Sequence, residues 1–171
     1  MSAQRPVLLG IDLGTARVKV GFVSPEGELL GVGRAPQATD VDPVSGRAEQ
    51  DANQWWAGLQ AALQQARPAT GDGMDIVGIA IAGHGPTATP VDADGRPTGP
   101  AVTWLDTRVG GERAALEAAI GLQGWALGVL PAASWLERAG RLGGTRWVLN
   151  SWEALTLRLT GEAATTLVPD Q

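Results

Sequence analysis

Apolar residues gather in short runs at the start of the chain, and turn-forming residues separate these runs. Val7–Leu13 and Val18–Val23 flank a tight turn at 14–17, which predicts a β-hairpin. A second turn at 25–28 precedes Leu29–Arg34, which predicts a third strand. The opening of the chain is therefore expected to be an antiparallel meander of three strands.

The pattern changes to helical spacing after a polar stretch. Thr39–Asp51 contains a proline and a glycine and is predicted to be a loop. Between Asp51 and Arg67, apolar residues recur at helical intervals, at Trp55, Leu59, Ala62, Leu63 and Ala66. Asp51 is suited to cap this helix, and Pro68 and Gly71 are expected to end it.

The second half of the chain alternates between strand and helix signals. Asp75–Ala82 is apolar almost throughout, which is typical of a strand buried on both faces. Thr87–Asp92 and Ala101–Leu105 are predicted to be short strands, with a hairpin turn at Asp92–Gly95. Three helices are predicted at Thr107–Ile120, Pro131–Ala139 and Ser151–Leu159, the last capped by Ser151 and ended by Gly161. The order of elements indicates a mixed α/β fold.

Composition narrows the classes of function. The 171 residues suit one domain or two small ones, and no cysteine is present for thiol catalysis or zinc–thiolate sites. The formal net charge of −5 argues against a nucleic-acid partner, which usually requires a basic face. No apolar run is long enough to span a membrane, and the N-terminus lacks the layout of a signal peptide. We therefore expect a cytoplasmic protein without a membrane partner.

Several familiar motifs are absent or misplaced. No P-loop is present. Residues 83–88 match the residue pattern of the G-x-G-x-x-A dinucleotide fingerprint but lack its structural context. That fingerprint must open a helix, whereas Pro86 and Pro90 fall where the first helical turns would lie. His84 is the only histidine, so a multi-histidine metal site is excluded.

The first predicted hairpin carries the clearest candidate chemistry. Asp12 ends the first strand, Gly14 and Thr15 form the turn, and Lys19, the only lysine, lies on the returning strand. A carboxylate can hold a metal ion through water, while turn N–H groups and an ammonium group attract an anion. Two interpretations stay open on these residues alone: a cradle for polyphosphate and Mg²⁺, or an edge hairpin with a solvated aspartate.

Further segments supply a family resemblance. Ile11–Thr15 with Lys19 resembles the phosphate hairpin of sugar kinases in the actin–hexokinase superfamily. Other matching segments follow in order: Glu49–Asp51 before Trp55 and Trp56, Gly78–Gly83, Asp92–Arg96, Pro100–Arg108 and Leu159–Glu162. Together they resemble the FGGY carbohydrate kinases, and within them xylulokinase-like members, over residues 7–162.

The resemblance implies a fold and an activity. It implies a ribonuclease H-like (actin/hexokinase-type) α/β first lobe, with a mixed sheet and flanking helices, which is expected to be incomplete. Residues 1–171 would form the N-terminal part of the first kinase domain. The nucleotide lobe and the catalytic aspartate are expected beyond Gln171, so no residue of this chain is assigned as catalytic. The intact enzyme would transfer a phosphoryl group from ATP to a ketose or polyol, and this chain alone would be inactive.

The same resemblance assigns cofactor residues in the hairpin. Asp12 would lie near Mg²⁺, through water, and near the transferred phosphoryl group. Gly14, Thr15 and Lys19 would face the phosphates of ATP.

The substrate residues implied by the resemblance are His84, Gly85, Pro86, Trp104 and Asp106. In an ungapped match, Pro86 falls at the sugar-contacting histidine of the family and has no side-chain donor. A shift of one residue stays open, and so does the identity of the ketose or polyol. Trp104 either stacks on a sugar or belongs to the core. Asp106 either contacts substrate or pairs with Arg108.

A second hypothesis comes from a different class of protein. The chain would then be a stand-alone, non-catalytic module that binds a sugar or a phosphate, or that pairs with a second polypeptide. In either case, a partial lobe is expected to expose apolar surface and to self-associate.

Overall fold

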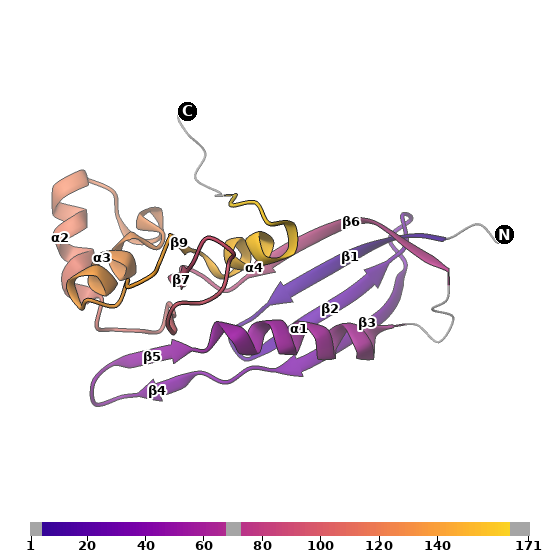
Figure 1. The fold of residues 1–171 in the computed structure, drawn as a ribbon, viewed down its shortest axis with the longest axis horizontal. Helices are drawn as coiled ribbons and strands as arrows, with labels where there is room; N and C mark the ends of the chain where they lie inside the picture. The colour runs from indigo at the N-terminus through magenta and orange to yellow at the C-terminus, as the bar shows by residue number, and fades with distance from the viewer. Residues whose placement is uncertain (1–4, 68–72, 165–171) are drawn as a thin grey trace. The chain divides into compact units, whose positions relative to one another are not determined.

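In the computed structural model, residues 5–67 and 73–164 are described, and they divide into two compact units (Figure 1). Unit 1 contains the described residues of Met1–Ala38 and Gln54–Gly83. Unit 2 contains those of Thr39–Asn53 and His84–Gln171. The composition had allowed either one domain or two small ones.

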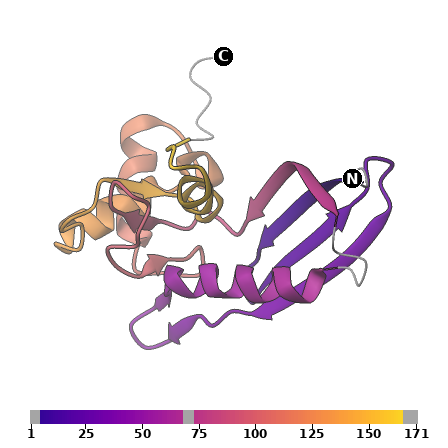
Figure 2. The ribbon, with the colours of Figure 1, turned by 45° about the vertical axis from the view of Figure 1, so that its right-hand side comes forward.

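Unit 1 is built on a four-stranded mixed sheet with the order β3-β2-β1-β6. The strands are β1 (Arg5–Leu13), β2 (Arg17–Val23), β3 (Leu29–Pro36) and β6 (Met74–Gly83). The first three pair antiparallel, which confirms the predicted meander. β6 pairs parallel to β1, so the sheet is mixed (Figure 2).

One face of this sheet is covered by α1 (Ala52–Ala66). The backbone N–H of Asn53 donates to Asp51 Oδ1 at 3.0 Å, which confirms the predicted cap. The buried side of the helix holds the predicted residues Trp55, Leu59, Ala62 and Ala66. The proposed helix-ending residues Pro68 and Gly71 lie outside the described residues.

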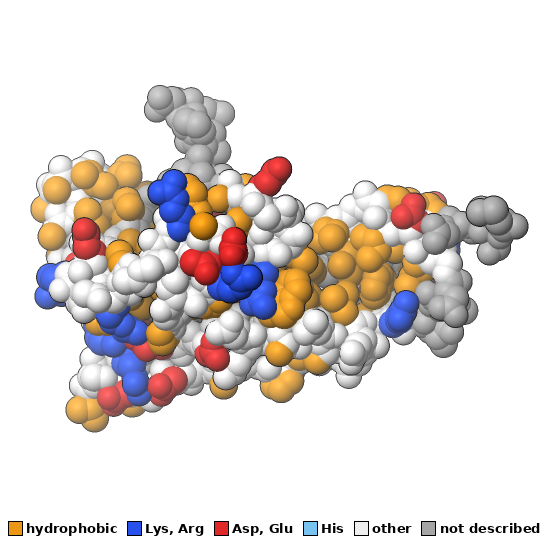
Figure 3. All heavy atoms as spheres, in the orientation of Figure 1, with side chains coloured by type: hydrophobic (Ala, Val, Ile, Leu, Met, Phe, Trp, Pro, Cys, Tyr) orange, Lys and Arg blue, Asp and Glu red, His pale blue; other side chains and the backbone are white. Residues whose placement is uncertain are grey.

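The prediction that the strand at Asp75–Ala82 is buried on both faces is wrong. Ile76, Val77 and Ile79 of β6 are 46%, 57% and 52% exposed. The reason is that β6 is an edge strand with β1 as its one neighbour among the described strands. Figure 3 shows hydrophobic side chains gathered on the surface over this sheet.

Unit 2 contains a polar hairpin where the sequence predicted a loop. β4 (Asp40–Asp42) and β5 (Arg47–Gln50) pair antiparallel, and β5 also pairs with β8 (Ala101–Val102). The turn between β4 and β5 is closed by the Asp42 carboxylate, which accepts hydrogen bonds from the Val44 N–H and the Ser45 hydroxyl. The prediction failed because these strands are joined by polar contacts, including the Arg47–Asp40 ion pair, and lack an apolar pattern.

Two small apolar clusters hold the rest of unit 2 together. β7 (Thr89–Val91) pairs with β9 (Trp147–Leu149), a strand that the sequence pattern did not predict. The clusters consist of Ala88, Val102, Val109 and Leu136, and of Val91, Leu149, Ala154 and Leu157. The helices that supply these residues are therefore fixed by burial rather than by long strands.

The helices of unit 2 largely match the predicted ones. They are α2 (Gly110–Ile120), α3 (Leu130–Arg138) and α4 (Ser151–Thr160), with a short 3₁₀ helix, η1 (Gly124–Leu127), that was not predicted. None of the helices in the described part of the chain is long and apolar enough to cross a membrane.

The two ends of α4 differ in how well they were predicted. Ser151 is not the cap: the residue before the helix is Asn150, whose backbone N–H donates to Glu153 at 2.8 Å. The Ser151 hydroxyl donates instead to the backbone oxygen of His84 at 2.7 Å. Gly161 ends the helix with a φ of 76°, as predicted.

The close approach of α1 to the sheet gives a test of unit 1. A Cβ added at Gly33 would lie 1.8 Å from the backbone oxygen of Ala62. We expect Gly33→Ala to lower the free energy of unfolding by about 3 kcal/mol, because the helix must move away. Gly10→Ala is the matched control on the same sheet, since its Cβ would lie 3.9 Å from the nearest atom outside its own chain neighbours. Urea unfolding of both variants measures the difference, and equal stabilities would contradict the packing described here.

Candidate functional site

The predicted phosphate hairpin is formed in unit 1. Asp12 and Lys19 are directly opposite each other on β1 and β2, and Lys19 Nζ lies 2.7 Å from Asp12 Oδ2. Their side chains are 48% and 52% exposed, so a ligand can reach both. The hairpin therefore presents one carboxylate and one ammonium group, side by side, at the point where β1 ends.

The turn of this hairpin is tightly fixed. The Gly14 N–H donates to Arg17 O at 3.0 Å, and a Cβ at Gly14 would lie 3.0 Å from that same oxygen. Gln37, the residue after β3, also holds this turn in place, because its side-chain amide donates a hydrogen bond to Gly14 O at 3.0 Å. Thr15 lies in the same turn. The structure thus brings the four predicted cofactor residues together.

The hairpin offers limited means to hold a metal ion. Among the described residues, no group of three His, Cys, Asp or Glu side chains could form a metal site. Asp12 would supply the one carboxylate. Mg²⁺ commonly keeps several waters and binds through one or two carboxylates plus substrate phosphates, so the residues present fit a magnesium–nucleotide complex.

A recess in unit 2 collects three of the five predicted substrate residues, Pro86, Trp104 and Asp106. Its lining also includes Thr103, Val109, Arg113, Gly128, Pro131 and Ala132. Trp104 is 46% exposed, so the interpretation as a core residue is wrong. An exposed indole beside a recess is suited to stack on the carbon face of a sugar.

The other two predicted substrate residues do not line this recess. His84 is buried, its Nδ1 lies 2.8 Å from Thr87 Oγ1, and its backbone oxygen accepts from Ser151. Gly85 is packed against Trp152, because a Cβ there would lie 2.7 Å from the indole. Both residues position the segment that carries Pro86, and contact of either with a sugar stays a prediction.

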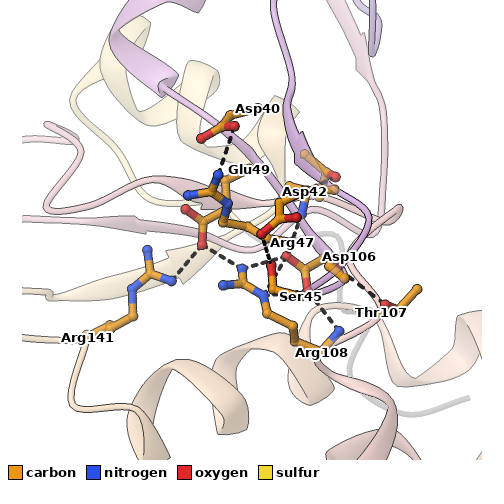
Figure 4. Close-up of polar contacts among 12 residues, drawn as sticks. Asp40, Asp42, Ser45, Arg47, Glu49, Asp106, Thr107, Arg108 and Arg141 are labelled. Carbon is orange, nitrogen blue, oxygen red and sulfur yellow. Dashed lines mark hydrogen bonds and ion pairs between the residues drawn. The ribbon is translucent and has the colours of Figure 1, made fainter.

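Behind the recess, a network of charged side chains crosses unit 2 (Figure 4). Arg108 contacts two carboxylates, at 2.6 Å from Asp106 Oδ2 and 2.6 Å from Glu49 Oε1. Arg141 Nη1 also lies 2.6 Å from the same Glu49 Oε1. The Asp106 side chain is fully buried and accepts the backbone N–H of Ala48 as well. The alternative in which Asp106 pairs with Arg108 is confirmed, and a contact of Asp106 with substrate stays a prediction.

Burial and pairing set the ionisation of this network. Burial alone would raise the pKa of Glu49, but hydrogen bonds from Arg141 and Arg108 outweigh it and lower the pKa below its usual value. Burial opposes the charge of Arg108 too, yet hydrogen bonds to Asp106 and Glu49 raise its pKa. The guanidinium of Arg108 also lies 4.2 Å above the centre of the Trp135 ring. Glu49 and Arg108 are therefore both held in their charged forms at neutral pH.

Part of this network was missed by the sequence interpretation. Trp135 packs beneath the guanidinium groups of Arg108 and Arg141. Glu49 was noticed only as part of a family motif, and Arg141 and Arg113 were not singled out. Glu49 could have been recognised from the sequence, because it comes just before a predicted helix. A carboxylate that is buried at such a position needs a cationic or hydrogen-bonding partner.

Comparison with known proteins identifies the family. Residues 7–125 match the N-terminal domain of the FGGY family of carbohydrate kinases. This chain belongs to that family. The FGGY resemblance, based on the hairpin and on the segments that follow it, is thus confirmed.

Individual FGGY relatives agree with the assignment. The chain is 36% identical over 115 residues to the xylulose kinase of Escherichia coli, which covers 66% of this chain and 23% of that protein. It is 33% identical over 101 residues to the L-xylulose/3-keto-L-gulonate kinase of the same species, which covers 58% of this chain and 20% of that protein. The chain spans about a third or less of the length of the curated relatives it matches.

A solved structure supports the fold class. The crystal structure described as a xyloylose kinase from Brucella ovis matches with a TM-score of 0.79 and 31% identity, covering 91% of this chain and 34% of that one. The expected α/β class, with the actin/hexokinase-type arrangement of FGGY sugar kinases, is confirmed.

The Arg108 network gives a prediction on stability. Arg108→Ala would leave the buried carboxylates of Asp106 and Glu49 without this cation, so we expect a loss of about 3 kcal/mol in the free energy of unfolding. Arg96→Ala is the control, because it breaks an ion pair with Asp94 whose side chains are 70% and 68% exposed, and should cost less than about 1 kcal/mol. Denaturant unfolding monitored by tryptophan fluorescence measures both, and equal losses would contradict the network's importance.

The pKa of Glu49 gives a second prediction, on acid stability. Because this pKa is lower in the folded than in the unfolded protein, pairing stabilises the fold above the unfolded value, about 4.3. That contribution is lost as the pH falls through the folded pKa. We expect Glu49→Gln to be less stable than the unmodified chain at pH 7, with the difference narrowing below about pH 4. Thermal unfolding across this range measures it, and a constant difference would refute the prediction.

Proposed function

We propose that this chain is the N-terminal part of an ATP-dependent carbohydrate kinase that phosphorylates a xylulose-like ketose or polyol. The observation that carries the proposal is the Asp12–Lys19 pair at the end of β1, in a chain that matches the FGGY family. The names of the relatives, xylulose kinase and L-xylulose/3-keto-L-gulonate kinase, support a sugar of the ketose class. The intact protein would act in the cytoplasm.

The hairpin would serve the nucleotide. Asp12 would hold Mg²⁺ through water, and Lys19 and the turn at Gly14 and Thr15 would face the phosphates of ATP. When bound, the metal would neutralise charge on the phosphates during transfer. The half-exposed Lys19 ammonium would add a positive charge beside the same anion.

The recess in unit 2 would serve the sugar. Trp104 would stack on its carbon face, and Pro86 would border it without donating a hydrogen bond. Phosphoryl transfer also needs a base to accept the proton of the attacking hydroxyl. None of the described residues at the recess is a free carboxylate, because Asp106 accepts from Arg108 and Ala48. The base is proposed to lie outside this chain, so the chain alone would be inactive.

A second candidate function is a non-catalytic module that binds a sugar or a phosphate, alone or with a second polypeptide. The observation that favours it is that each unit already carries its own candidate binding residues. The exposed edge of β6 would also allow copies of the chain to associate. Light scattering tests this association, and a single monomeric species at high concentration would argue against it.

One set of assays separates these proposals. Phosphorylation of xylulose and of a panel of pentuloses and polyols by the chain with Mg-ATP should be absent, whereas calorimetry should detect Mg-ATP or xylulose binding. Robust turnover would overturn the proposed lack of activity. Failure of both ligands to bind would overturn the binding module and the ligand roles of both units.

The role of Trp104 gives a direct prediction. Trp104→Ala should weaken xylulose binding about tenfold, because a stacking surface for the sugar is removed. Trp125→Ala is the matched control, since Trp125 is 70% exposed and does not line the recess. Titration calorimetry compares the two dissociation constants. Equal values in both variants would exclude Trp104 from sugar recognition.

A further inference from the structure

Arg113 of α2 lines the recess together with Trp104 and Pro86. It is partly buried, and its guanidinium makes no ion pair or hydrogen bond with any side chain among residues 5–67 and 73–164. Arginine carries its charge at every pH at which the protein is folded. A partly buried cation at the edge of a recess, without a carboxylate to neutralise it, is suited to receive an anion.

The other arginines of unit 2 near this region are already engaged. Arg108 and Arg141 contact Glu49, and Arg138 is paired with Glu112. The acidic residue that lines the recess, Asp106, is fully buried and is neutralised by Arg108. Arg113 therefore contributes a positive charge to the recess that none of its described lining residues offsets.

The rest of the lining offers few hydrogen-bonding side chains to the hydroxyl groups of a sugar. Pro86 has no side-chain donor, and the Thr103 hydroxyl already donates to Ala48 O at 2.9 Å. Val109, Pro131 and Ala132 are apolar. A ligand here would find an apolar surface, an indole and one guanidinium. That combination favours a molecule with a carbon face and a negatively charged end.

We propose that Arg113 selects a sugar acid as the acceptor: a ketose or polyol chain that ends in a carboxylate. The planar guanidinium fork matches a carboxylate and binds it with charge-assisted hydrogen bonds. The recess has a volume of about 10 Å³, which is room for about one water, so the sugar lies across its mouth. This inference rests on the proposed function, because it names the class of sugar for the same recess.

The test compares two probes that share a carbon skeleton. Xylitol and D-xylonate differ in one end group, a hydroxymethyl in the first and a carboxylate in the second. We expect calorimetry at fixed ionic strength to give xylonate a dissociation constant about tenfold lower than that of xylitol. In Arg113→Gln this ratio should fall to about one, because the guanidinium that would bind the carboxylate is removed. Arg113→Lys should keep part of the preference, because it keeps the charge but loses the fork.

Arg96→Gln is the matched control, since it removes an exposed arginine of unit 2 that does not line the recess. It should leave the ratio at about ten. Circular dichroism and the unfolding midpoint establish that each variant is folded. A ratio that persists in Arg113→Gln would overturn the assignment of Arg113.

Other outcomes separate this inference from the proposed function. Equal binding of xylitol and xylonate by the unmodified chain overturns the sugar-acid inference alone. Failure of both probes to bind overturns the sugar site itself, and the inference with it. Inorganic phosphate that binds as tightly as xylonate, with the same dependence on Arg113, would show a general anion site and would overturn the choice of a sugar acid.

Discussion

The organisation of unit 2 depends on the guanidinium of Arg108, which lies between two carboxylates that are largely out of water. A fully buried carboxylate such as Asp106 destabilises the fold unless it is paired and hydrogen-bonded. Arg108 supplies that pairing and extends it to Glu49, at the end of a hairpin far away in the sequence. Through Glu49 the network reaches Arg141, beyond the end of α3. Arg108 and Glu49 thus connect three segments that lie far apart in the sequence.

This arrangement also determines which residues of the recess remain available to a ligand. Asp106 faces the recess, yet its oxygens accept from Arg108 and from the backbone of Ala48, so its charge is balanced within unit 2. Of the other lining residues, Trp104 is 46% exposed, and Arg113 makes no ion pair in the described part of the chain. The stabilising network and the proposed sugar site therefore use neighbouring residues of unit 2.

Three strands of unit 1 could be recognised from the local sequence pattern. Alternation and turn residues predicted β1, β2 and β3, and the register that places Lys19 opposite Asp12 follows directly from the short turn between them. The hairpin and the pairing of Asp12 with Lys19 could therefore be predicted from local sequence, whereas a phosphate role for it came only from the family resemblance. The polar hairpin at 40–50 could not, because its strands are held by ion pairs and backbone contacts, for which periodicity carries no signal.

By itself, the sequence determined the α/β class, most of the helices, the meander and the positions of Asp12 and Lys19 on the first hairpin, because these depend on neighbours within a few positions. Only the tertiary structure decided that Glu49 and Arg141 share a network with Arg108, that Trp104 is exposed, and that β6 lies at a sheet edge. It also placed Arg113 beside Trp104 at the recess. The physical reason is that burial and charge pairing are set by residues tens of positions away, which local spacing does not reveal.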